Sequence, residues 1–410
     1  MNRAASLSAP LVTALSTTIG CASPPRRAPV AEVEAAAVPE PDHPKLWRDV
    51  PTFYSTVCPP PAFVLDTPLI KTIARQTFTI TGTHAVREQR QSGPLIIGVL
   101  GAVKDAADDT RKNLEKAKAA FQKAKGSLIL LNGDVAETAE IHDVFNLVGD
   151  VFGDAIPLVV HSGNSEWTSG FTDAFVDAEA AHPAFINKNF VRDLDLGGVH
   201  LVSLPGCSVR QFVKQGGCHY ETKHVEEAGI LLDAVAAKGD VAILTAHGPP
   251  RGVDGKSLDR TFDDGNVGDI DVAKLLQDGK ARFGIFGHIL ESGGRATADA
   301  TTHAPLPLPM KKSSSSLFMN VGSASSVGVE LLNKKTSRGI AAIVTVDNLA
   351  SGGTATVSFV PLKKWRAISL RPASAPAEQT LPARLVLAPA GLTQPPLPLS
   401  GFVRALLRSV

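Results

Sequence analysis

Four segments of the sequence each place a side chain with metal-binding chemistry directly after an apolar, strand-like run. Asp134 follows LILLNG, Asn164 follows PLVVHSG, His247 follows VAILTA, and His288 follows RFGIFG. A carboxylate, an amide oxygen and two imidazoles suit divalent transition metals such as Mn, Fe or Zn. Taken singly, each is ordinary, because Gly-Asp and Gly-Asn are common turns and a lone histidine is commonly structural. As an ordered set after four strands, they predict one shared site.

The region that must position these side chains extends from residue 94 to about residue 362. Apolar strand-like runs alternate there with helical patterns, and Leu114, Ala117, Phe121 and Ala124 share one face of such a helix. Alternating strands and helices predict an α/β domain with a substantially parallel sheet. Ligand sites of open α/β sheets lie outside the carboxyl ends of the strands. The runs GIAAIVTVD and TATVSFVPL, separated by NLASGG, predict a closing hairpin.

The amino-terminal segment has the character of an export signal. Residues 1–20 carry one charge, Arg3, and small residues precede Cys21. This pattern is typical of a bacterial lipoprotein signal peptide, with Cys21 acylated after cleavage. The alternative is a leader with an incidental cysteine. The first interpretation predicts a protein of the bacterial cell envelope, lipid-anchored after export, whose only membrane contact is that anchor.

Composition divides the remainder of the chain. Residues 21–65 are rich in proline and alanine and are expected to form a tether, and residues 366–410, rich in Pro, Ala and Leu, a tail. The folded domain is therefore expected at 66–365. The charges of the whole chain nearly cancel, with 41 basic and 40 acidic residues, so no electrostatic case for nucleic-acid recognition is evident.

The chain has four cysteines, and their pairing depends on the compartment in which the protein resides. Cys207 and Cys218 lie close together in the sequence, and an oxidising envelope compartment would allow them to form a disulfide. Two free thiols are the alternative. Their spacing fits no zinc-ribbon pattern. On this interpretation Cys58 is left unpaired.

The order of these motifs resembles that of the calcineurin-like metallophosphoesterases, over roughly residues 94–362. LLNGDVAE resembles the Gly-Asp block of that family, HSGNSEW the Gly-Asn block, TAHGPP the isolated histidine and FGHILESGG the final block. The resemblance implies an α/β fold, a four-layer αββα sandwich of two mixed sheets. It also implies hydrolysis of phosphate esters by two bridged metals.

The departures from the family pattern are concentrated on one metal. Gly101-Ala102-Val103 stand where the family has Asp-x-His, Leu290 stands where it has the last histidine, and Ser165 replaces the histidine after the asparagine. The resemblance therefore implies that one metal has lost its private ligands. The ligands of the other metal are all present, as Asp134, Asn164, His247 and His288.

This pattern predicts a metallophosphoesterase-like hydrolase with a reduced, single-metal site for one Mn, Fe or Zn ion. Its substrate would be a phosphorylated small molecule or another phosphoester. The alternative is a catalytically inactive relative that acts as an envelope metal- or phospho-ligand-binding protein. Because a serine hydroxyl does not titrate near neutrality as histidine does, Ser165 cannot supply a proton as an imidazolium would. We expect much reduced activity, and no catalytic residue is assigned.

Overall fold

The computed structural model of the chain describes residues 57–299, 305–307 and 309–363. The predicted signal peptide with Cys21, most of the predicted tether and the predicted tail lie outside these residues. The first described strand, β1, begins at Val64, just before the expected domain boundary. Among the helices of the described residues, none has the length and apolar character needed to cross a membrane.

One sheet has six strands in the order β17-β16-β4-β5-β6-β7. Its parallel strands are β4 (Leu95–Leu100), β5 (Leu128–Asn132), β6 (Leu158–His161) and β7 (Phe185–Asn187). The antiparallel pair β16 (Ile340–Asp347) and β17 (Thr354–Pro361) extends the sheet beside β4. This pair confirms the predicted closing hairpin.

The second sheet has nine strands in the order β1-β2-β3-β8-β9-β10-β11-β13-β12. Its parallel centre consists of β9 (Val199–Leu204), β10 (Val241–Ala246), β11 (Phe283–Phe286) and β13 (Leu317–Asn320). The flanking strands are β1 (Val64–Ile73), β2 (Gln76–Gly82), β3 (His84–Arg87), β8 (Asp193–Asp195) and β12 (Arg295–Thr297). A separate ribbon pairs β14 (Val329–Glu330) with β15 (Thr336–Ser337).

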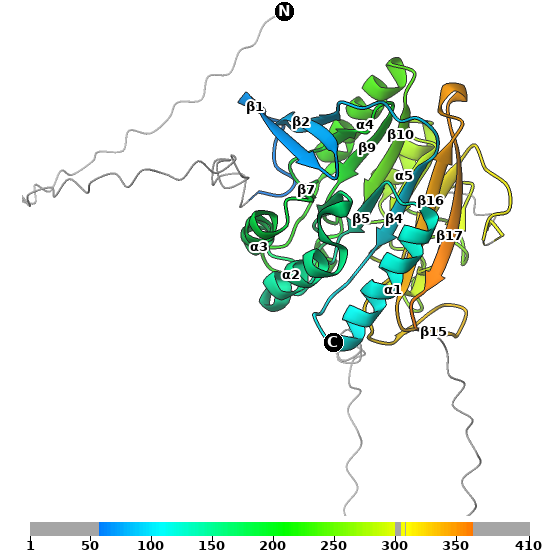
Figure 1. Cartoon of the computed structure of the whole chain (residues 1–410). Helices are drawn as coiled ribbons and strands as arrows, with labels where there is room; N and C mark the ends of the chain where they lie inside the picture. Colours follow the sequence, from blue (N-terminus) through cyan, green and yellow to red (C-terminus); the bar gives the residue numbers. More distant parts are fainter. Residues whose placement is uncertain (1–56, 300–304, 308, 364–410) are drawn as a thin grey trace, which may run out of the picture. The chain divides into compact units, whose positions relative to one another are not determined.

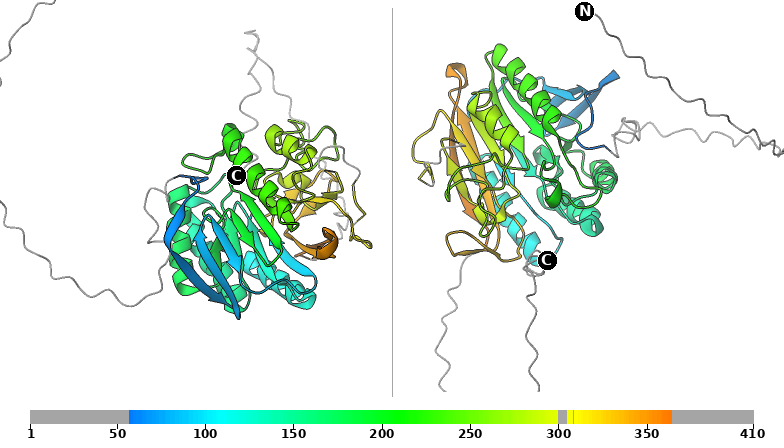
Figure 2. Two further views of the ribbon diagram at one scale, coloured as in Figure 1. Left: turned by 90° about the horizontal axis from the view of Figure 1, so that it is seen from above. Right: turned by 180° about the vertical axis from the view of Figure 1, so that it is seen from behind.

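Helices cover the outer face of each sheet (Figures 1 and 2). The six-stranded sheet carries α1 (Asp108–Ala124), α2 (Ile141–Phe152) and α3 (Thr168–Ala181). The nine-stranded sheet carries α4 (Thr222–Ala237) and α5 (Ile270–Gln277). The result is the expected four-layer αββα sandwich of two mixed sheets.

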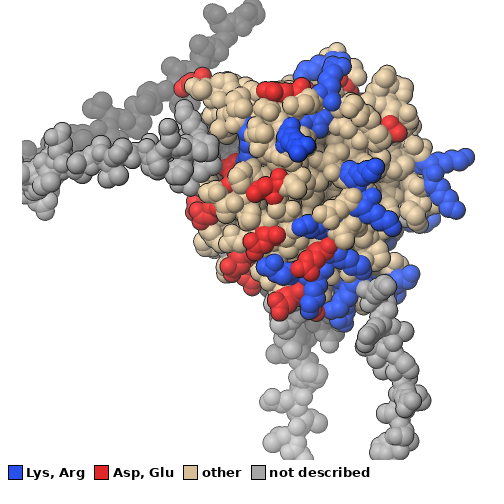
Figure 3. Space-filling view, viewed as in Figure 1, with Lys and Arg blue, Asp and Glu red and all other residues tan. Residues whose placement is uncertain are grey.

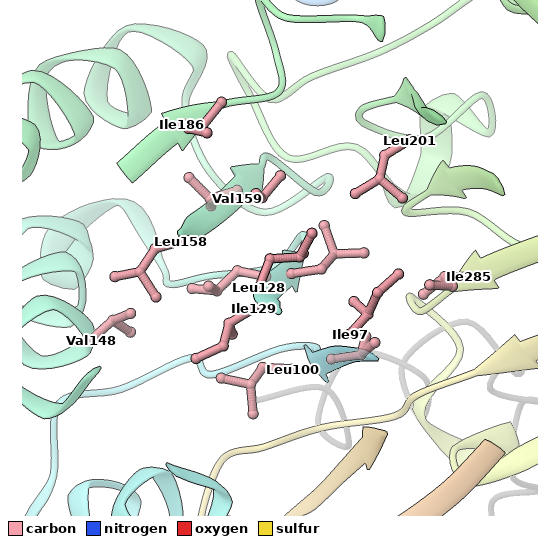
Figure 4. Packing of buried hydrophobic residues seen from close by; sticks show 14 of the residues in the cluster. Ile97, Leu100, Leu128, Ile129, Val148, Leu158, Val159, Ile186, Leu201 and Ile285 are labelled. Atoms are coloured by element: carbon pink, nitrogen blue, oxygen red, sulfur yellow. The ribbon is translucent and has the colours of Figure 1, made fainter. Parts of the chain in front are cut away.

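The two-residue period of the strands explains why the buried side chains form two clusters. Successive side chains of a strand point to opposite faces of its sheet. In β9, Leu201 therefore joins the large core with the six-stranded sheet, whereas Val202 joins the cluster under α4 and α5. Figure 4 shows Leu201 and Ile285 with Ile97 among the buried side chains of the large core. Each such buried aliphatic side chain stabilises the fold by about 1.5–3 kcal/mol.

The surface carries both signs of charge. Figure 3 shows basic and acidic side chains together on one face of the molecule. This distribution is in keeping with the net charge of +1.

Candidate metal centre

The two sheets deliver the predicted ligands from opposite sides. Asp134 and Asn164 follow β5 and β6 of the six-stranded sheet, whereas His247 and His288 follow β10 and β11 of the nine-stranded sheet. Asn132 joins the two sides, because its Nδ2 donates to the carbonyl oxygen of Ala246 at 3.0 Å. The Nδ1 of His247 in turn donates to the carbonyl oxygen of Asn132 at 3.0 Å. These two hydrogen bonds fix His247 relative to the end of β5.

Three of the predicted ligands are in direct contact. The Nε2 of His247 lies 2.9 Å from Asn164 Oδ1 and 3.2 Å from Asp134 Oδ1. With Nδ1 occupied as a donor, the neutral form of His247 presents its Nε2 lone pair to this place. Burial would lower the pKa of His247, but the Asp134 carboxylate outweighs it and raises that pKa in the absence of a metal. Ligand atoms held at about 2.1 Å from a metal, and 90° apart, are about 3 Å from each other. The spacings therefore fit adjacent ligands of one cation.

Asp134 supplies the observation that points most directly to a cation. Its side chain is 5% exposed, and Oδ1 accepts no hydrogen bond from a described residue, although His247 Nε2 is near. A buried carboxylate oxygen without a hydrogen bond carries a free-energy cost that a bound cation would remove. The donor set and this oxygen together fit a divalent metal at Asp134, Asn164 and His247.

His288 lies beside these three residues with a different partner. Its ring centroid is 5.1 Å from that of His247, and its Nε2 is 3.7 Å from Cys207 Sγ. Burial and the neighbouring His247 lower the pKa of His288 to about 3, so it is neutral. Among the described residues, no group of three or more His, Cys, Asp and Glu side chains is arranged to hold a metal. The three residues in contact therefore include one that is not of these types, Asn164, which contributes its amide oxygen.

The site contains two residues with unfavourable backbone angles and one glycine at a very close contact. Asp134 and His288 have φ angles of 52° and 63°, which residues other than glycine adopt at a cost of about 1–3 kcal/mol. A Cβ atom on Gly163 would lie 2.4 Å from Asp134 Oδ1 and 2.8 Å from His247 Cε1. Only glycine at position 163 therefore allows the loop after β6 to approach these two side chains.

Glu166 connects the loops that carry Asp134 and Asn164. Its Oε2 accepts a hydrogen bond from the backbone N–H of Gly163 at 2.9 Å, and its Oε1 accepts one from Val135. Burial and the nearby Asp134 raise the pKa of Glu166 to about 7. Glu166 therefore holds the two loops together.

Lys104 is a site residue that the sequence analysis missed. Its Nζ lies 2.9 Å from Asp134 Oδ2, and its side chain is 27% exposed. Burial would lower the pKa of Lys104, but the Asp134 carboxylate outweighs it and raises that pKa. Burial would likewise raise the pKa of Asp134, but Lys104 and His247 hold it well below its usual value. The sequence signal that could have identified Lys104 is its place directly after Gly101-Ala102-Val103, where the family pattern has Asp-x-His.

The altered positions themselves are filled by core packing. A Cβ on Gly101 would lie 2.5 Å from the carbonyl oxygen of Gly322 and 2.6 Å from Val321 Cγ1. The side chain of Val103 is 1% exposed and belongs to the large core. An aspartate at position 101 is therefore excluded without movement of the backbone after β13. In place of the ligands of a second metal, this side of Asp134 has the ammonium of Lys104.

The predicted disulfide between Cys207 and Cys218 is wrong. Cys218 is bonded to Cys58, and Cys207 is a free, buried thiol whose pKa burial raises to about 12. The segments of Cys207 and Cys218 do lie side by side, with Cys207 N donating to Cys218 O at 3.1 Å. However, the Cys207 thiol contacts His288, and the fold brings Cys58 to Cys218 across 160 residues. Proximity in sequence did not decide which thiols meet.

Solved structures that are similar to this chain include several phosphatases. A dimetal phosphatase from Danio rerio matches with 11% identity over 65% of this chain and 98% of that chain, with a TM-score of 0.41. A purple acid phosphatase from yellow lupin matches with 12% identity over 70% and 59%, with a TM-score of 0.42. GAP50, the anchor in the inner membrane complex of Plasmodium, matches with 13% identity over 68% and 87%, with a TM-score of 0.43.

These likenesses concern the fold alone. No protein-family model matches the sequence, and no curated protein matches it. The chemistry of the chain therefore follows from its own residues.

Proposed function

We propose that the chain is a metallophosphoesterase-like hydrolase of phosphate esters with a reduced site for one divalent ion, Mn, Fe or Zn. The ion would be held by Asp134, Asn164 and His247, with His288 as the fourth ligand. The observation that carries this proposal is the buried Asp134 Oδ1, which lacks a hydrogen bond and lies 3.2 Å from His247 Nε2.

A metal bound here would polarise a phosphoryl oxygen and acidify a water molecule. The chain's own residues prepare the place for it. Asn132 fixes the tautomer and orientation of His247, as partners of metal-binding histidines commonly do. Asn164 donates through Nδ2 to the carbonyl oxygen of Phe212 at 2.6 Å, so its Oδ1 remains turned toward His247. Glu166 holds the loops of Asp134 and Asn164 together.

A second candidate function is a catalytically inactive protein that binds a metal or a phosphorylated ligand at the cell envelope. Ser165 favours it, because this buried hydroxyl replaces the imidazole that could protonate a leaving group. Both candidates place the chain at the bacterial cell envelope through a lipid on Cys21. They differ only in turnover.

One experiment separates them. The mature chain, produced with Cys21→Ser to keep it in solution, is purified, and its metal content is measured by elemental analysis. Hydrolysis of p-nitrophenyl phosphate and bis(p-nitrophenyl) phosphate is then followed with added Mn²⁺. We expect about one metal per chain and slow turnover that His247→Ala abolishes. His142→Ala, on the exposed surface of α2, is the matched control.

The other outcomes are equally informative. One bound metal without turnover supports the binding protein. No bound metal contradicts the hydrolase and leaves a phosphorylated ligand as the only occupant for the binding protein. Metal that persists after loss of both Asp134 and His247 shows that the site is elsewhere.

A further inference from the structure

We propose that Lys104 is a built-in cation of this site, which binds an oxygen of the phosphoryl group beside the single metal. This inference rests on the proposed function, whose metal ligands include Asp134. The second positive centre would be an ammonium group of the chain itself.

The carboxylate of Asp134 has a different partner on each oxygen. Oδ1 lies toward His247 and Asn164, in the place that fits a metal, whereas Oδ2 pairs with Lys104 Nζ at 2.9 Å. The two oxygens of one carboxylate thus hold two positive positions close together. Two adjacent positive centres are what a two-metal hydrolase uses to hold the oxygens of a phosphoryl group.

Lys104 is fixed to the loop of Asp134 by its backbone. Its N–H donates to the carbonyl oxygen of Val135 at 2.8 Å, and it forms a parallel bridge with Ala136. Its φ angle is 71°, which is uncommon for a residue with a side chain. A strained backbone held by such contacts keeps the lysine at this position, whereas a lysine on a surface helix would move freely.

The ammonium is available to a ligand. The side chain is 27% exposed, and Asp134 Oδ2 accepts the only hydrogen bond that Nζ makes to a described residue. An ammonium has three N–H donors, so two remain for an oxyanion. The carboxylates of Glu137 and Glu166 also face Lys104, but Glu137 is paired with Lys214 and Glu166 with backbone N–H groups.

Positions 101 and 103, where the family pattern has ligands of the second metal, carry no metal-binding side chain. Gly101 packs against the carbonyl oxygen of Gly322, Val103 lies in the core, and the ammonium itself occupies Asp134 Oδ2. A lysine supplies charge and hydrogen bonds to a phosphoryl oxygen, but it cannot generate hydroxide from water as a metal does. The arrangement therefore favours a site that still binds phosphate but hydrolyses phosphate esters slowly.

The test measures binding of Mn²⁺ and of inorganic phosphate to the mature Cys21→Ser chain by titration calorimetry. Lys104→Met removes the charge, and Lys104→Arg keeps it. Lys112→Met, an exposed lysine of α1, is the matched control. With Mn²⁺ present, we expect Lys104→Met to weaken phosphate binding by about tenfold or more, and Lys104→Arg and Lys112→Met to stay within about threefold of wild type. Mn²⁺ should bind Lys104→Met at least as tightly, because a neighbouring positive charge is gone.

Phosphate binding by Lys104→Met at the wild-type affinity overturns the proposal, provided that the variant still unfolds at the wild-type temperature and binds Mn²⁺. Wild-type chain that binds Mn²⁺ but not phosphate also overturns it and leaves the metal site intact. If the wild type binds no Mn²⁺, the proposed function fails, and Lys104-dependent phosphate binding in EDTA then still supports the role of the lysine. If the wild type binds neither Mn²⁺ nor phosphate, both the proposed function and the role of Lys104 are overturned.

Discussion

Asp134 combines three features that a residue in an ordinary turn does not share. It has a positive φ angle, it is almost fully buried, and its two oxygens face a candidate metal position and an ammonium group. The first two features cost free energy on their own, and strained, buried polar residues are concentrated at functional sites. The neighbouring loop must come very close for this arrangement to exist, and Gly163 permits that approach.

Replacement of Gly163 by alanine tests this closeness. The added methyl group would overlap Asp134 Oδ1 and His247, so we expect metal affinity to fall by about 10–100-fold. Overpacking should also reduce the free energy of unfolding by about 1–3 kcal/mol. Mn²⁺ titration and urea unfolding measure the two effects. Gly255→Ala is the control, since no atom lies within 4 Å of its added Cβ. An unchanged Mn²⁺ affinity for Gly163→Ala would place the metal away from this loop.

At the scale of elements, the site depends on loops from two sheets being held in register. Asn132 and Glu166 supply local links, and the Cys58–Cys218 disulfide supplies a covalent one. That disulfide joins the segment before β1 to the loop before α4, across 160 residues. A crosslink over so long a loop restricts the unfolded chain strongly in the chain-entropy model.

The double variant Cys58→Ser, Cys218→Ser is therefore expected to lose about 2–5 kcal/mol of unfolding free energy. Both cysteines are replaced because a lone Cys218 thiol beside the segment of Cys207 could form a new bond. Urea unfolding with and without reductant measures the effect. Reductant should lower the wild-type midpoint to that of the variant and leave the variant unchanged. Equal midpoints for the oxidised wild type and the variant would contradict the stabilising role.

At the scale of the whole molecule, one buried lysine links the free energy of unfolding to pH. Lys188 is fully buried between β7 and β8, where its Nζ donates to the carbonyl oxygens of Arg192 and Leu201. Burial lowers the pKa of Lys188 to about 7. In the unfolded chain its pKa returns to about 10.4. Between these values the unfolded chain binds more protons than the folded chain, so stability rises with pH.

The expected rise is up to about 1.4 kcal/mol per pH unit from about pH 7 upward. It should be absent from Lys188→Met, which has no proton to lose. Urea unfolding of wild type and variant at pH 7, 8 and 9 yields the difference at each pH. The exposed Lys256→Met serves as control and should follow the wild type. A constant difference between wild type and Lys188→Met over this range would show that Lys188 keeps its proton when folded.

Much of the fold and of the candidate site could be predicted because the relevant signals are local. Alternating apolar runs predicted the strands and the closing hairpin. The residues after four strands predicted one shared site, and the structure brings Asp134 and Asn164 against His247, with the ring of His288 beside it. Parallel strands bring their carboxyl ends to one edge, so position in the chain predicts proximity within each sheet, whereas the meeting of the two sheets depends on how they pack.

Tertiary structure alone decided the rest. The partner of Cys218, the ion pair of Lys104 with Asp134, and the packing of Gly101 on Gly322 all join residues far apart in the sequence. Such contacts depend on how two sheets pack and on which side chains then share a space, and no local pattern encodes that. For the same reason, sequence identified His288 as a ligand candidate, but only the structure placed its Nε2 against Cys207.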